Sequence, residues 1–312
     1  MQALGRRYSA YCSLALALAL VSCRMPPSVA GSPPEAVSLL GERLYAPPIS
    51  PATRVLYEQR LAEARAAYDR APTNADSIIW LGRRTAYLGS YRDAIAIFTE
   101  GVARHPDEAR MYRHRGHRYV SVRELDKAIA DLSRAAALTT GRPDEIEPDG
   151  IPNARNIPTS TLQSNIWYHL GLAHYLKGDF ERALASYREA MRVSRNPDML
   201  VATSHWLYMT LRRLGRAEEA ESVLASISRG MVIIENDAYH RLLLLYKGEL
   251  PPDSLAPSGA DALNDASVGY GLGNWHLYNG RRAEALAVFR RVLAGGNWPA
   301  FGYIASEAEL AR

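Results

Sequence analysis

Residues 78–98 read IIWLGRRTAYLGSYRDAIAIF, and residues 112–132 read YRHRGHRYVSVRELDKAIADL. The two stretches repeat with a period of 34 residues, which is the separation of Gly82 and Gly116. In both, the glycine is followed after a turn by Ala-x-x-x-Phe or Ala-x-x-x-Leu. Small residues at these positions let two antiparallel helices cross closely, and a large apolar residue fills the space beside them. The pattern predicts stacked helix pairs.

This pattern resembles the tetratricopeptide repeat, a unit of 34 residues that forms a helix-turn-helix pair. A third copy occupies residues 167–187, where Gly171 precedes Tyr187. Residues 198–229 and 272–289 match the pattern more loosely. The resemblance implies an all-α fold, a right-handed superhelical solenoid of about five helix pairs. We expect this repeat domain to cover residues 53–312.

Several segments depart from the repeat. Residues 139–161 are rich in proline, glycine and acidic residues, so they predict an insertion loop rather than a helix. Loops of this length inside packed arrays are usually functional or disordered. The Gly-x-Gly-x-Gly run at 269–273 has no preceding strand, which favours close helix packing over a dinucleotide site. Residues 298–312 are predicted to form an amphipathic helix that caps the open end of the solenoid.

The N-terminus has the features of a secretory signal. Arg6 and Arg7 precede an apolar run, and no acidic residue occurs in residues 1–22. The run ends in Leu-Val-Ser followed by Cys23, which resembles the bacterial lipobox. The resemblance implies a signal peptide over residues 1–22 and a diacylglycerol group on Cys23. We therefore expect a protein anchored by lipid in the cell envelope, at the outer membrane if the bacterium has two membranes.

A proline-rich segment over residues 23–52 is predicted to be an extended tether between the lipid and the repeat domain. Its apolar side chains, including Leu39, Leu44 and Tyr45, are unusual for a linker, so part of it is expected to dock as a strap along the first helices.

Composition excludes some classes of function. The full chain of 312 residues carries a net charge of +4, and removal of Arg6 and Arg7 with the signal leaves it close to neutral, so we expect no nucleic-acid partner. Cys23 would be the only cysteine left, which excludes an internal disulfide and a cysteine nucleophile. No phosphate-binding loop, zinc-protease motif or serine-hydrolase elbow occurs. We therefore expect a binding protein without a cofactor.

In proteins with this repeat, the first helix of each pair lines a concave groove. Transferred by register, the resemblance implies a groove for a partner protein or peptide, formed by Arg83, Tyr87, Arg110, Arg113, His117, Tyr168 and Tyr175.

The run Arg113-His-Arg-Gly-His-Arg118 leaves three interpretations open. In the first, the loop acids Asp144, Glu145, Glu147 and Asp149 fold back and pair with it. In the second, the basic groove residues bind a carboxylate of a partner. In the third, a metal or hydrolytic site is built from His114, His117, His169, Asp144 and Glu147. A further alternative is a glycan-binding lipoprotein of nutrient uptake, because exposed tyrosine and tryptophan rings stack on sugars.

Overall fold

A computed structural model describes residues 33–255 and 262–312. From Pro34 to Arg312 the chain is one compact unit. The predicted signal peptide, Cys23 and the first part of the tether lie outside the described residues. Among the described helices, none is both long and apolar enough to cross a membrane.

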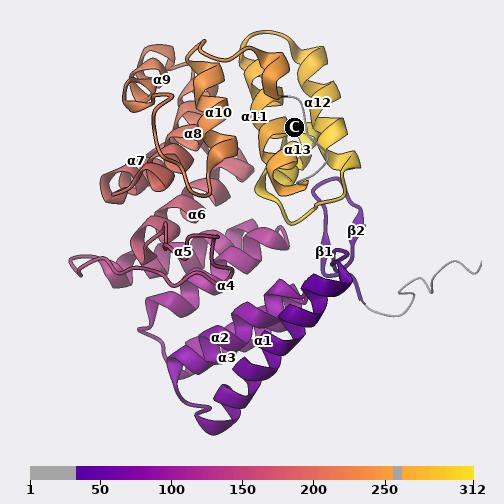
Figure 1. Cartoon of the computed structure of the whole chain (residues 1–312), viewed down its shortest axis with the longest axis vertical. Helices are drawn as coiled ribbons and strands as arrows, with labels where there is room; N and C mark the ends of the chain where they lie inside the picture. Colours follow the sequence, from indigo (N-terminus) through magenta and orange to yellow (C-terminus); the bar gives the residue numbers. More distant parts are fainter. Residues whose placement is uncertain (1–32, 256–261) are drawn as a thin grey trace, which may run out of the picture. The chain divides into compact units, whose positions relative to one another are not determined.

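The predicted all-α repeat fold is confirmed (Figure 1). The described residues form five helix pairs: α2 (Ala75–Tyr87) with α3 (Tyr91–Arg104), α4 (Ala109–Ser121) with α5 (Leu125–Thr139), α6 (Leu162–Lys177) with α7 (Phe180–Val193), α8 (Pro197–Arg213) with α9 (Ala217–Val223), and α11 (Ala262–Tyr278) with α12 (Arg282–Ala294). The helix α1 (Pro51–Arg70) precedes them, α10 (Asp237–Tyr246) lies between the fourth and fifth pairs, and α13 (Phe301–Ala311) ends the chain.

The signature glycines hold the pairs together as their spacing predicts. A Cβ atom added at Gly82 would lie 2.6 Å from the Phe98 ring, and one added at Gly116 would lie 2.8 Å from Leu132. The same close approach occurs between Gly171 and Tyr187 and between Gly273 and Phe289. The other glycines of the 269–273 run contact Val292 and Leu242, so this run packs helices, as expected.

The second part of the predicted tether is docked rather than extended. Strands β1 (Ala36–Val37) and β2 (Arg43–Leu44) form a short antiparallel hairpin. Ala36 and Leu44 are buried in one cluster with Tyr91 of α3 and Trp298. The indole Nε1 of Trp298 donates a hydrogen bond of 2.8 Å to the carbonyl oxygen of Tyr45. This hairpin corresponds to the expected strap, and it also contacts the segment before α13.

The last helix differs from the amphipathic cap that the sequence predicts. Every residue from Gly302 to Glu309 is buried, and α13 packs against α6, α11 and α12. Its polar residues have partners inside the protein: Glu307 pairs with Arg123 at 2.7 Å, where their side chains are only 1% and 2% exposed. Glu309 pairs with Arg213 at 2.6 Å. Because these carboxylates are neutralised internally, α13 is buried on all sides.

Candidate functional site

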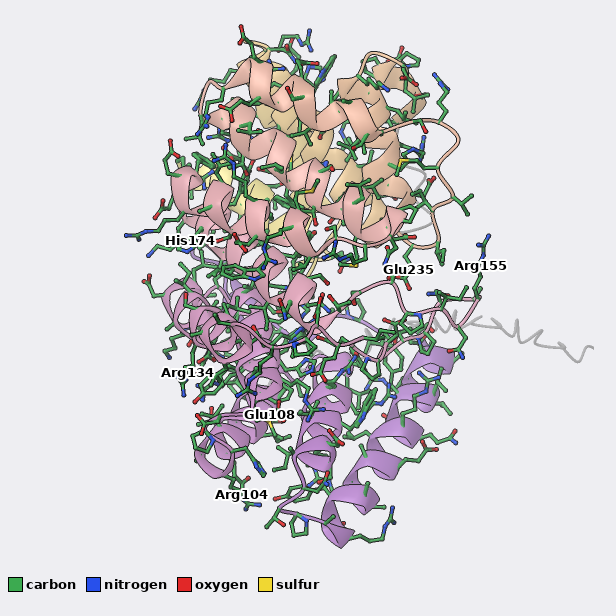
Figure 2. All side chains as sticks on the ribbon, turned by 90° about the vertical axis from the view of Figure 1, so that its left-hand side faces the viewer. Arg104, Glu108, Arg134, Arg155, His174 and Glu235 are labelled. Atoms are coloured by element: carbon green, nitrogen blue, oxygen red, sulfur yellow. The ribbon has the colours of Figure 1, made fainter. Side chains whose placement is uncertain are left out.

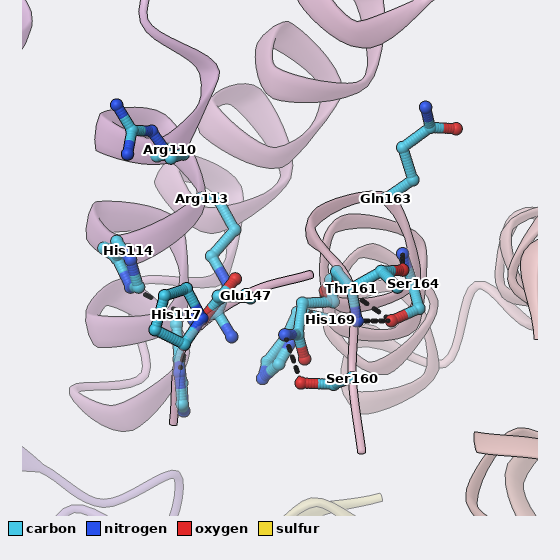
Figure 3. A network of polar contacts seen from close by, with 12 residues as sticks. Arg110, Arg113, His114, His117, Glu147, Ser160, Thr161, Gln163, Ser164 and His169 are labelled. Carbon is cyan, nitrogen blue, oxygen red and sulfur yellow. Dashed lines mark hydrogen bonds and ion pairs between the residues drawn. The ribbon is translucent and has the colours of Figure 1, made fainter. Parts of the chain in front are cut away.

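The insertion loop between α5 and α6 crosses the first helices of the first two repeats. Arg83 on α2 donates a hydrogen bond of 2.8 Å from Nη2 to the carbonyl oxygen of Pro148. Arg113 on α4 lies 2.9 Å through Nε from Oε2 of Glu147, and both side chains are 7% exposed. Figure 3 shows Glu147 between Arg113 and the histidines of α4 and α6. The loop is thus held on the inner helices by arginine side chains.

The first of the three interpretations is therefore confirmed for Glu147. The other loop acids have different roles. Asp144 accepts hydrogen bonds from the hydroxyl of Thr161 at 2.6 Å and from the backbone N–H of Gln163 at 3.0 Å, at the start of α6. Asp149 faces a cavity that the loop encloses together with the helices.

This cavity has a volume of about 500 Å³. Residues from the loop and from α4, α6, α8, α10 and α13 line it. Its aromatic and apolar lining includes Tyr168, Met199, Ala202, Tyr239 and Phe301, and its polar lining includes Arg113, His117, Asp149, Asn165, His169 and Glu235. The volume is in the range of ordinary ligand pockets.

One wall of the cavity is aromatic. The hydroxyl groups of Tyr168 and Tyr239 lie 3.4 Å apart, which links α6 to α10. The Phe301 ring lies 5.5 Å from the rings of both His117 and His169, so the start of α13 closes one side of the cavity. Sequence reasoning missed Tyr239 and Phe301, because neither belongs to the first helix of a matched repeat.

His117 and His169 form a neutral pair beside this wall, with ring centroids 4.3 Å apart (Figure 3). Burial lowers the pKa of both imidazoles well below the usual value, and neighbouring arginines lower it further. His117 Nδ1 lies 3.2 Å from the guanidinium of Arg113 and must accept its hydrogen bond. His169 Nδ1 lies 2.6 Å from the carbonyl oxygen of Asn165 and must donate. His117 therefore keeps its proton on Nε2, whereas Nε2 of His169 is an acceptor.

Two carboxylates, those of Asp149 and Glu235, also line the cavity. Burial raises the pKa of Asp149, and the charge of Glu235 raises it further. Glu235 accepts hydrogen bonds from Asn153 at 2.7 Å and from Thr159 at 2.5 Å, so it is fixed to the insertion loop. Figure 2 shows Glu235 beside the loop that carries Arg155. The buried carboxylate of Asp198 accepts the backbone N–H of Glu235 at 2.8 Å and thereby positions the start of α10.

The predicted groove residues fall into three groups. Arg113, His117 and Tyr168 line the cavity. Arg83 and Tyr87 lie under the loop, where they line a smaller cavity of about 90 Å³ together with Glu147.

The remaining two groove residues lie outside the cavity. Arg110 pairs with Glu108 and Asp76, each at 2.7 Å. Tyr175 does not face an open groove: it is 1% exposed, and its hydroxyl group is hydrogen-bonded to Tyr270 at 2.7 Å and Asn274 at 2.8 Å. The fifth helix pair covers this part of α6, which the repeat register alone does not reveal.

The metal candidates do not come together as a group. His114 stacks on Phe98 with ring centroids 5.6 Å apart, Asp144 holds the start of α6, and Glu147 pairs with Arg113. Over the described residues, no set of three or more His, Cys, Asp or Glu side chains is placed to hold a metal ion. The ligand group required by the third interpretation is therefore not formed among the described residues, although the rings of His117 and His169 are in contact.

The repeat assignment is supported by family models. Family models of the tetratricopeptide repeat match residues 81–143 and 164–197. Comparison with curated proteins gives no match. Among solved structures, YrrB, described as a TPR protein with an unusual peptide-binding site, is 16% identical with a TM-score of 0.42, covering 74% of this chain and 91% of YrrB.

A crystal structure of MamA is 18% identical with a TM-score of 0.43, covering 64% of this chain and 95% of MamA. A putative kinesin light chain of Podosopora anserina with TPR-like repeats is 15% identical with a TM-score of 0.41, covering 72% of this chain and 95% of that chain. From the family models and the helix-pair geometry, we conclude that the chain contains tetratricopeptide repeats.

Proposed function

We propose that this protein is a lipid-anchored scaffold of the cell envelope that binds an extended segment of a partner protein in the 500 Å³ cavity and performs no catalysis. The observation that carries the proposal is the cavity itself, which is lined by several repeats and the insertion loop. Hydrogen-bonding groups and aromatic rings both line it, which is the combination that recognises side chains of a peptide.

The partner segment that binds is proposed to be only a few residues long. The insertion loop lies over Arg83 and Arg113, and α13 packs against α6, so the inner face does not offer a groove along its whole length. A partner would reach the protein at the cavity, where Ala202 and Tyr239 are only partly buried. Repeat proteins host many partners on one fold, so the cavity rather than the fold determines what binds.

Site-specific photo-crosslinking tests the proposal in the native membrane. A photoreactive residue at Ala202 should crosslink one partner protein, whereas the same residue at the exposed Ala103 on α3 should not. Ala202→Trp should abolish capture by filling the cavity, with Ala103→Trp as the matched control. The proposal is wrong if crosslinking from both positions is the same, or if a glycan binds the wild type but not Ala202→Trp.

Lipid attachment is supported by the sequence that ends at Cys23 and needs a separate experiment. Metabolic labelling with a fatty-acid probe should label the wild type and leave Cys23→Ser unlabelled and released from membranes. Two acyl chains are enough for stable anchoring, since each buried CH₂ contributes about 0.8 kcal/mol. A Cys23→Ser protein that remains labelled would contradict the proposed anchor.

A further inference from the structure

Two carboxylates in the lining of the cavity have no ion pair among the described residues. Arg113 is neutralised by Glu147 at 2.9 Å, and both cavity histidines are neutral. Within the part of the chain that the structure describes, no hydrogen bond or ion pair reaches the carboxylate of Asp149. Glu235 accepts hydrogen bonds from neutral groups and likewise has no ion pair among the described residues. Asp149 and Glu235 therefore have no ion-pair partner among the described residues, although Arg83 is close enough to lower the pKa of Asp149.

Burial and neighbouring charges both act on the pKa of Asp149. Burial and the charge of Glu235 raise the pKa of Asp149, and the opposing effect of Arg83 is smaller. The charge of Glu235 thus repels the ionised carboxylate of Asp149 in the free protein. A cation entering the cavity would relieve this repulsion.

His169 provides a second, independent feature. It lines the cavity and is only 4% exposed. Its Nδ1 proton is used by the carbonyl oxygen of Asn165, so Nε2 carries a lone pair, and no described residue donates to it. Since His169 lines the cavity, this acceptor is available to an N–H group of a ligand.

We propose that the cavity receives a lysine or arginine side chain of the partner segment, with Asp149 and Glu235 as counter-charges and His169 as a hydrogen-bond acceptor. This inference rests on the proposed function. The rings of Tyr168 and Tyr239 form the adjacent wall, and aromatic rings attract ammonium and guanidinium groups. By charge alone, the basic groove residues would favour a carboxylate of the partner, but Arg113 is already paired with the carboxylate of Glu147. A partner would have to displace Glu147, which is tethered beside Arg113 by the loop.

Selection from a displayed library of random peptides tests the proposal with the full-length protein. Peptides enriched by the wild type, but not by Ala202→Trp, should contain a lysine or arginine at a fixed position. A selected peptide should bind the Asp149→Asn, Glu235→Gln double variant about tenfold or more weakly. Asp107→Asn changes an exposed carboxylate that does not line the cavity, so it should leave the affinity of the peptide unchanged.

The outcomes separate this inference from the proposed function. Selected peptides that bind the wild type but not Ala202→Trp could be acidic or uncharged, or could bind the double variant as tightly as the wild type. Either result would overturn the inference of a cationic side chain but would still support a peptide site. No enrichment, or equal binding to Ala202→Trp, would overturn both. The affinity of a selected peptide for the single variant Asp149→Asn gives an independent test, because the Asp149 side chain has no hydrogen bond among the described residues to lose on substitution.

Discussion

Glu147→Gln should release the insertion loop from the inner helices. The Arg113–Glu147 pair has a separation of 2.9 Å, and each side chain is 7% exposed. Removing one partner of a buried ion pair typically costs about 3–5 kcal/mol, because the other charge stays buried without compensation. Glutamine keeps one acceptor, and Arg113 keeps its contacts to His114 and His117. We therefore expect the lower end, about 3 kcal/mol.

Hydrogen exchange measured by mass spectrometry is the appropriate assay. A loss of about 3 kcal/mol in the free energy of local opening corresponds to about a hundredfold faster amide hydrogen exchange. The effect should appear in the loop, where the backbone N–H of Glu147 donates to Ser160 at 3.2 Å. The helices α11 and α12 should exchange as in the wild type, unless the loss spreads to global unfolding and lowers the melting temperature.

A matched control is Glu58→Gln on α1, because Glu58 pairs with Arg54 at 3.6 Å with both side chains about half exposed. Such a surface pair contributes less than about 1 kcal/mol. The double variant Arg113→Leu, Glu147→Leu should recover much of the loss, since no charge is then left buried. Equal loop exchange in Glu147→Gln and Glu58→Gln would refute the reasoning.

Three further predictions concern packing and pH. Gly171→Ala should lower the free energy of unfolding by about 1–3 kcal/mol, because its Cβ would lie 2.7 Å from the Tyr187 ring, whereas Gly230→Ala meets nothing within 4 Å. His205→Phe should reduce the loss of stability as the pH falls from 6.5 towards 3. Burial lowers the pKa of His205 to about 3, so in this range the unfolded chain takes up a proton and the folded chain does not. This difference costs the wild type about 1.4 kcal/mol of stability per pH unit. Asp149→Asn should raise the melting temperature at pH 7 but not near pH 3, because the raised pKa means that ionisation of this carboxyl favours the unfolded state as pH increases.

Urea unfolding at a series of pH values checks the prediction for His205→Phe, and thermal melting checks the other two. Similar melting of Gly171→Ala and Gly230→Ala would show that the helices tolerate the extra methyl group. An unchanged acid slope in His205→Phe would mean that the buried imidazole takes up a proton in the folded state. A lower melting temperature of Asp149→Asn at pH 7 would show that this carboxylate is stabilised by its surroundings.

Sequence reasoning identified much of the site but not its shape. One of the three interpretations of the basic run had the acidic insertion fold back on it, and Glu147 does so. His117 and Tyr168 were placed on the inner helices by the repeat register, and both line the cavity. Glu235 was not identified, because it lies 86 residues after Asp149 in an irregular unit and carries no motif.

The sequence by itself determined the helix pairs and their packing. A period of 34 residues with small residues at fixed positions encodes contacts between neighbouring helices, and Gly82, Gly116 and Gly171 make the predicted contacts. Only the tertiary structure decided that α13 is buried and that the inner face is reduced to a cavity. Those features depend on partners far apart in the chain, such as Arg123 with Glu307, which are 184 residues apart. A local pattern describes what a helix can bury, whereas the match between distant charges decides where that helix is buried.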